Sequence, residues 1–104
     1  MSLQRFIIER EIPKVGSLDA AQLRDAAAKS NDVLRRLGPD IQWVESYIAA
    51  DRMFCVYLAA DENIIRQHAQ MSGFPASRVV PILRRIDPTT AQSRVAAVRE
   101  TIPA

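Results

Sequence analysis

Two neighbouring stretches decide the fold of this 104-residue chain: IQWVESYI at residues 41–48 and MFCVYL at residues 53–58. Both are rich in β-branched and aromatic residues, which favour extended strands. Only the residues AADR, at 49–52, separate them. The pattern therefore predicts an antiparallel hairpin, around which the other elements have to pack.

A strand and a long helix are predicted before the hairpin. Apolar residues between charged ends at 5–10, closed by Pro13 and Gly16, indicate the strand. Ser17 is the expected N-cap of the helix, and Gly38, which is followed by a proline, is its expected end. Residues spaced three and four apart predict the inward face of this helix: Leu23, Ala27, Ser30, Leu34 and Leu37.

A second helix and a last strand are predicted after the hairpin. The helix should begin at Asp61, which can cap its free N–H groups, and end at Gly73. Its expected inward stripe is Ile64, His68 and Met71. The strand at 79–83 contains Pro81, whose missing N–H favours a place at the edge of a sheet.

The order of these elements is the βαββαβ order of a ferredoxin-like α+β fold. We expect a four-stranded antiparallel sheet in the spatial order 4-1-3-2, with two helices on one face. Residues 1–91 should form this domain, and residues 92–104 a helical tail. A short C-terminal helix should start near Asp87, and the tail residues expected to dock are Val95, Val98 and Ile102.

Composition limits the classes of function. With 48% hydrophobic and 25% charged residues, the chain has the make-up of one globular domain. Cys55 is the only cysteine, so no intramolecular disulfide can form, and we expect a cytoplasmic protein that is neither exported nor inserted in a membrane. A net charge of +2 makes nucleic acid an unlikely partner. Small size and aromatic strands favour a homodimer.

Several short motifs give the chain a resemblance to a known bacterial family. They are LGPDIQWV at 37–44, SY at 46–47, CVY at 55–57, RQHA at 66–69, GFPA at 73–76 and IDPTTA at 86–91. The chain resembles a family of small ferredoxin-like proteins, a domain of unknown function that includes an actinobacterial nickel-binding protein. The resemblance implies a cytoplasmic homodimer of the dimeric α/β-barrel type and Ni²⁺ as a cofactor. Gln67 stands where the family often has glutamate, which would weaken any metal site that uses this acid.

His68 is the principal candidate for a metal ligand. It is the only histidine, and its place on the inward stripe puts an imidazole in a pocket, where it suits nickel, copper or zinc. The alternative is a hydrogen-bonded core histidine. Glu9 is the second candidate, if its face of the strand turns inward and not toward a dimer surface. One histidine and one cysteine cannot build a closed soft site, so an open site with oxygen ligands, or ligands from a second subunit, is expected.

Four further residues are candidates for contacts to a small ligand: Ser30, Trp43, Tyr47 and Tyr57. Ser30 interrupts the apolar stripe of the first helix and either faces the pocket of His68 or bonds back to the carbonyl of Ala26. The three aromatic residues bring rings with polar groups to the hairpin, where they either line a pocket or fill the core and a subunit interface.

Three functions remain open. The leading hypothesis is a non-catalytic dimeric protein that binds a metal of the nickel type or a small ligand. A monooxygenase-like enzyme that uses the pocket around His68 is an alternative, although no paired acid and base are visible. A structural dimerisation module is the other alternative. The run RMFCVY at 52–57 is similar to an RNA-recognition motif but lacks its glycine, so RNA binding is disfavoured.

Overall fold

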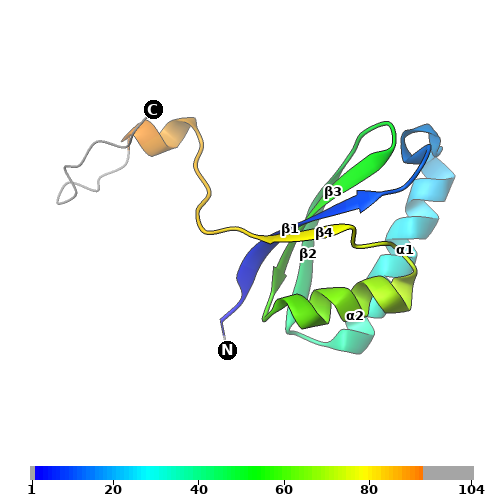
Figure 1. Ribbon diagram of the computed structural model, residues 1–104, viewed down its shortest axis with the longest axis horizontal. Coiled ribbons are helices and arrows are strands. Elements are labelled where there is room, and N and C mark those ends of the chain that lie inside the picture. The colour runs from blue at the N-terminus through cyan, green and yellow to red at the C-terminus, as the bar shows by residue number, and fades with distance from the viewer. Residues whose placement is uncertain (1, 93–104) are drawn as a thin grey trace.

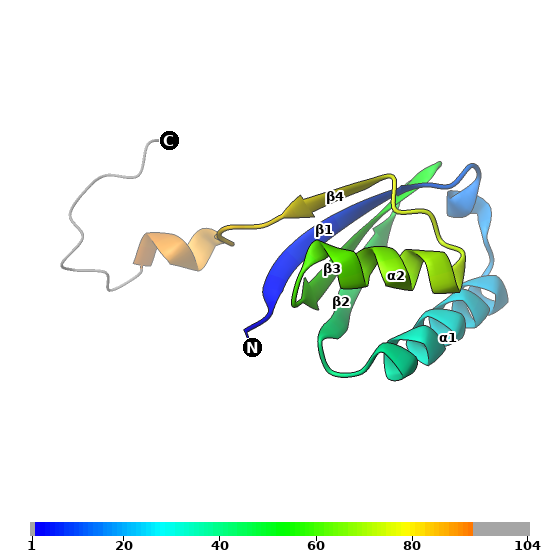
Figure 2. The ribbon, with the colours of Figure 1, turned by 60° about the horizontal axis from the view of Figure 1, so that its bottom comes forward.

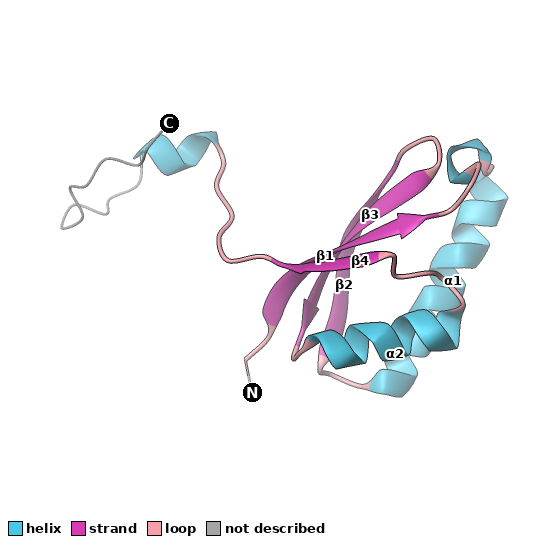
Figure 3. Ribbon diagram, viewed as in Figure 1, coloured by secondary structure: helices cyan, strands magenta, loops and turns pink. Residues whose placement is uncertain are grey.

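The computed structural model describes residues 2–92. Four strands and two α-helices follow one another in the predicted order (Figures 1 and 3). The elements are β1 (Gln4–Glu11), the short 3₁₀ helix η1 (Val15–Ser17), α1 (Ala20–Leu37), β2 (Ile41–Ile48), β3 (Arg52–Ala59), α2 (Glu62–Ser72), β4 (Arg78–Pro81) and the 3₁₀ helix η2 (Pro88–Gln92). None of the helices within residues 2–92 has the length and apolar character needed to cross a membrane.

The strands form one antiparallel sheet in the order β2-β3-β1-β4. This is the predicted order, and both helices cover the same face (Figure 2). The α+β, ferredoxin-like architecture is therefore confirmed. Pro81 lies on the edge strand β4 and pairs with Phe6 of β1. At a sheet edge, its missing N–H does not cost a hydrogen bond between strands.

Alternation along β1 separates two environments. Phe6, Ile8 and Arg10 are buried on the face that the helices cover, whereas Ile7 and Glu9 lie on the open face. The core forms on the covered face because β3 and α2 add their apolar residues there. The buried core cluster comprises Phe6, Ile8, Ile41, Cys55, Tyr57, Ala59 and Ile65.

The helix ends follow local hydrogen bonding. Asp19, and not the predicted Ser17, caps α1: its side chain accepts from the backbone N–H of Gln22, whose own side chain accepts from the N–H of Asp19. This reciprocal capping box satisfies two free N–H donors. Ser17, two residues further from the helix, cannot satisfy both. Asp61 caps α2 and Gly73 ends it in the left-handed conformation, as predicted.

The buried face of α2 is turned slightly from the predicted one. Ile65, His68 and Ser72 are buried, whereas Met71 is 44% exposed. The prediction was right for His68 and wrong for Met71, because both sets have helical spacing about His68 and the face turned to the sheet is the one with Ile65 and Ser72. His68 is completely buried, so an imidazole does point into the interior.

Residues 82–92, which follow β4, lead away from the domain (Figure 1). The fourth strand ends at Pro81, two residues before the predicted end, and residues 82–87 lead away from the sheet (Figure 1). Leu83 and Ile86 are 87% and 72% exposed in this segment. The 3₁₀ helix η2 follows Asp87, where the C-terminal helix is predicted to start. The predicted docking residues Val95, Val98 and Ile102 lie outside the described residues.

Candidate ligand-binding site

A cavity of about 360 Å³ lies between α1 and the covered face of the sheet. This volume is within the range of small-molecule sites, which are typically apolar with a few convergent polar groups. The walls come from β1, the loop with η1, α1, β2, β3 and Phe74, the second residue after α2. The lining residues are Arg10, Ile12, Val15, Leu18, Leu23, Ala26, Ala27, Ser30, Trp43, Ser46, Ile48, Met53, Cys55, Tyr57 and Phe74.

The loop between β1 and α1 covers one end of the cavity because it is tied to the β2–β3 turn. The N–H of Ile12 donates to the carbonyl of Asp51, and that of Gly16 donates to the carbonyl of Ala50 at 2.9 Å. A Cβ on Gly16 would lie only 2.6 Å from the carbonyl oxygen of Ala49. Glycine thus allows the close approach that holds the loop over the cavity.

Of the described residues, Arg10 is the only one with a charged side chain that lines the cavity, and it is 2% exposed. Nε donates to Cys55 Sγ at 3.4 Å, and Nη1 donates to the carbonyl oxygens of Phe74 and Pro75 at 3.2 and 3.0 Å. Nη2 makes a long bond of 3.5 Å to the hydroxyl oxygen of Tyr57. All these acceptors are neutral, so the guanidinium charge is hydrogen-bonded but not neutralised.

Ser30, Tyr57 and His68 form a polar group beside Arg10. The Ser30 hydroxyl and His68 Nε2 are hydrogen-bonded at 3.0 Å, and the rings of Tyr57 and His68 meet edge-on with their centroids 5.4 Å apart. Ser30 and Tyr57 line the cavity, while His68 lies behind them. Among residues 2–92, His68 Nδ1 is the one buried side-chain nitrogen or oxygen without a hydrogen-bond partner.

Burial governs the protonation of this group. Desolvation, reinforced by the positive charge of Arg10 and opposed by hydrogen bonding to Ser30, lowers the pKa of His68 from 6.5 to about 4. Its imidazole is therefore neutral near pH 7. Desolvation also raises the pKa of the Tyr57 hydroxyl, against the opposing effect of Arg10. Tyr57 stays protonated and can donate a hydrogen bond into the cavity.

The cavity brings together some of the predicted site residues. Ser30, Trp43 and Tyr57 line it, and His68 touches two of them. Tyr47 lies outside the cavity, 58% exposed, and donates a hydrogen bond to Glu45. A β-bulge between Trp43 and Glu45 explains this, because the extra residue places Tyr47 on the opposite face from Trp43.

Glu9 also lies on the open face, with the sheet between it and His68. It pairs across strands with Arg52, whose Nη1 is 2.6 Å from Glu9 Oε2. The two candidate metal ligands therefore cannot hold the same ion within one chain.

Comparison with known proteins identifies the family. A family model described as the nickel responsive protein SCO4226-like matches residues 6–82, which include both α-helices, β2, β3, β4 and all but the first two residues of β1. The chain belongs to the SCO4226-like family. The predicted family resemblance is thereby confirmed, and residues 83–92 lie beyond the matched segment.

A solved relative has the same fold. The crystal structure of SCO4226 from Streptomyces coelicolor A3(2) is similar with a TM-score of 0.66, and the match covers 79% of this chain and 99% of that one. The sequence identity is 10%, so this likeness shows the fold alone. No curated protein matches the chain.

The SCO4226-like family is described as nickel responsive, which raises the question whether the side chains of this protein can hold nickel. Residues 2–92 contain no group of three or more His, Cys, Asp or Glu side chains close enough to hold one ion. The charge of Arg10 further disfavours a cation beside His68. Within one chain, these residues do not form a nickel site.

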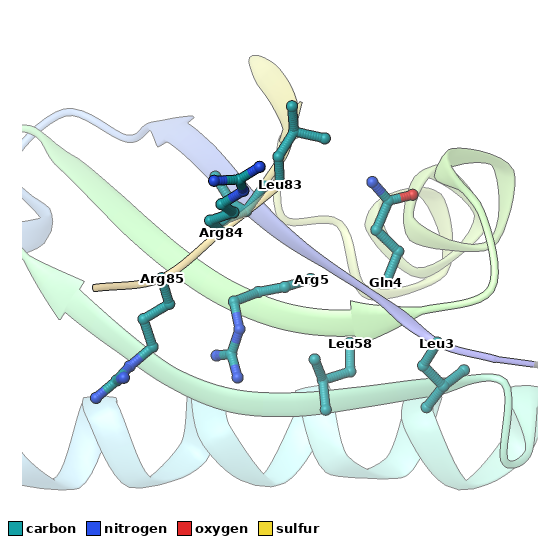
Figure 4. A pocket seen from close by; sticks show the side chains of 8 residues that line it. Leu3, Gln4, Arg5, Leu58, Leu83, Arg84 and Arg85 are labelled. Carbon is teal, nitrogen blue, oxygen red and sulfur yellow. The ribbon is translucent and has the colours of Figure 1, made fainter. Parts of the chain in front are cut away.

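A second hollow of this SCO4226-like protein lies where the chain leaves β4 (Figure 4). Its volume is about 410 Å³. Arg5 and Leu58 contribute from the open face of the sheet, and Leu83, Arg84 and Arg85 from the segment after β4.

Arg10 is the site residue that the sequence interpretation missed. A signal for it is present in the sequence: Phe6, Ile8 and Arg10 are two residues apart, and alternation along a strand puts such residues on one face. The charged ends of the segment 5–10 predict a strand that stops at Arg10, whereas β1 continues to Glu11.

Proposed function

We propose that this protein is a non-catalytic binding protein that holds a small organic molecule in the cavity between α1 and the sheet. The observation that carries the proposal is the cavity's make-up: an apolar wall with the polar groups of Arg10, Ser30 and Tyr57 in its lining. Such a combination gives affinity through apolar burial and orientation through a few hydrogen bonds.

Blocking the cavity tests this proposal. Ala27 lines it from α1, whereas Ala28, the next residue, is exposed. Ala27→Phe should fill the space, and Ala28→Phe adds the same ring to the surface as a matched control. N-phenyl-1-naphthylamine, a neutral fluorescent probe, should bind the wild type and Ala28→Phe, and at least tenfold more weakly to Ala27→Phe. Equal binding by all three proteins would refute the proposed site.

We also propose that the protein is a homodimer formed through the open face of the sheet. This face carries partly buried apolar side chains from three strands, among them Ile7, Phe54, Leu58 and Val80. Exposed Leu83, next to the second hollow, extends this apolar surface. Burying such a face against a second copy would stabilise a domain of this size.

We also propose that the protein is located in the cytoplasm.

We propose nickel as the second candidate ligand. It is favoured by the family's description and by one buried ring nitrogen of His68. His68 Nδ1 is buried, has no partner among residues 2–92, and belongs to a neutral imidazole. A nickel site there would need further donors from a second subunit or from water. Calorimetry with Ni²⁺ and tag-free protein, beside His68→Gln, tests it: binding lost in the variant supports a site at His68, and no binding by the wild type refutes it.

A further inference from the structure

Among residues 2–92, Arg10 is a buried cation without an acidic partner. The ion pairs among residues 2–92 are made by Arg35, Arg52, Arg66 and Arg85. Removing an ion from water is expensive unless a counter-charge compensates, and here the acceptors are only carbonyls, a thiol and a phenol. This cavity therefore has a fixed positive charge in a wall that is otherwise mostly apolar.

We propose that the ligand is an organic monoanion whose carboxylate pairs with Arg10. This inference rests on the proposed function, because it names the chemical class of molecule that the cavity takes. One guanidinium among apolar walls matches one negative charge, since a second charge on the ligand would be buried without a partner.

The hydrogen bonds of Arg10 show where the carboxylate fits. Nε and both hydrogens of Nη1 are directed at the Cys55 thiol and at the carbonyls of Phe74 and Pro75. Nη2 has two hydrogens and one contact, the 3.5 Å bond to Tyr57, which is at the limit of a hydrogen bond. Nη2 is thus the donor that remains available for a ligand oxygen.

Two neutral hydroxyls complete the anion site. Tyr57 stands next to Arg10, with the guanidinium carbon 5.9 Å from its ring centroid. Ser30 faces the cavity from α1, and its hydroxyl is bonded to the neutral imidazole of His68. If His68 Nε2–H donates to the serine oxygen, the serine O–H can turn from its hydrogen bond with Tyr57 to donate to the carboxylate. His68 is then a positioning residue for Ser30.

The remaining lining selects the body of the ligand. Apolar side chains surround the cavity on the sheet, on α1 and in the covering loop: Ile12, Leu18, Leu23, Trp43, Ile48 and Met53. They fit a small aromatic or alkyl group, and they offer no charged group that could bind a polar part of the ligand. The class is therefore a small apolar carboxylate.

A matched pair of ligands tests the charge. Naphthalene-2-carboxylate and the neutral naphthalene-2-carboxamide have nearly the same shape, and each can be titrated against bound N-phenyl-1-naphthylamine. The wild type should bind the carboxylate at least tenfold more tightly than the amide, since a charge-assisted hydrogen bond is stronger than a neutral one. In Arg10→Gln this preference should vanish, with amide binding changed by less than threefold.

Control variants separate charge, position and folding. Arg36→Gln removes an exposed arginine from the far end of α1 and should keep the full carboxylate preference. Tyr57→Phe keeps the ring and should reduce the preference severalfold, which supplies a readout if Arg10→Gln does not fold. Equal affinity of the wild type for both compounds would overturn the carboxylate inference while leaving the cavity as a neutral site. Failure of the wild type to bind N-phenyl-1-naphthylamine would instead refute the proposed function.

Discussion

Acidification should destabilise this protein through His68, the only histidine in the chain. The pKa of His68 is 6.5 in the unfolded chain and about 4 in the folded one, because the ring is buried beside Arg10. As the pH falls from about 6.5 to 4, the unfolded state takes up the proton first, so acid favours unfolding. The stability that neutral His68 allows is present above pH 6.5 and is lost toward pH 4.

The size of the effect follows from the two pKa values. Each unit of pKa difference is worth about 1.4 kcal/mol, so protonation of the unfolded chain lowers the free energy of unfolding by about 2 kcal/mol between pH 7.5 and pH 5. Carboxylates contribute little over this interval, because most of their titration occurs below about pH 5.

Urea unfolding at the two pH values measures this loss in the wild type and in His68→Gln. Glutamine keeps a polar group near Ser30 but does not titrate. The wild type should lose about 2 kcal/mol more stability than the variant on going to pH 5. If both proteins lose the same amount, His68 is not held neutral by burial, and the interpretation of the polar group beside Arg10 is wrong.

Three further changes test other parts of the structure. Gly16→Ala should cost about 1 to 3 kcal/mol, because the new methyl group would meet the carbonyl of Ala49; urea unfolding with no loss would contradict the close approach. Asp19→Ala removes the capping box of α1 and should cost about 1 kcal/mol by the same assay, whereas Ser17→Ala should be nearly neutral; the reverse ranking would refute the assigned cap. Phe54→Lys places a charge on the open face and should convert the proposed dimer to monomer by light scattering, with an unchanged circular dichroism spectrum; a wild type of about 11.6 kDa would refute the dimer.

The order and type of the main elements could be predicted because local patterns determine them. The β-rich hairpin, the capping aspartate at Asp61 and the left-handed Gly73 each act within a few residues. Pro81 added a long-range constraint, since a residue without an N–H fits only certain positions in a sheet. Together these features predicted the fold.

The candidate site was only partly predictable, because its geometry depends on details that simple alternation does not contain. One bulge after Trp43 reverses the face of every later residue in β2, which moved Tyr47 away from the cavity. The environment of Arg10 depends on carbonyls of Phe74 and Pro75, more than sixty residues away in the chain. No sequence periodicity reports where such carbonyl groups point.

A crystal structure of the protein with naphthalene-2-carboxylate is the most direct test of the central claim. We predict that the ring system occupies the cavity between α1 and the sheet, with a carboxylate oxygen about 3 Å from Arg10 Nη2. A cavity closed by its own side chains, or a ligand bound elsewhere with Arg10 still unpaired, would contradict the account.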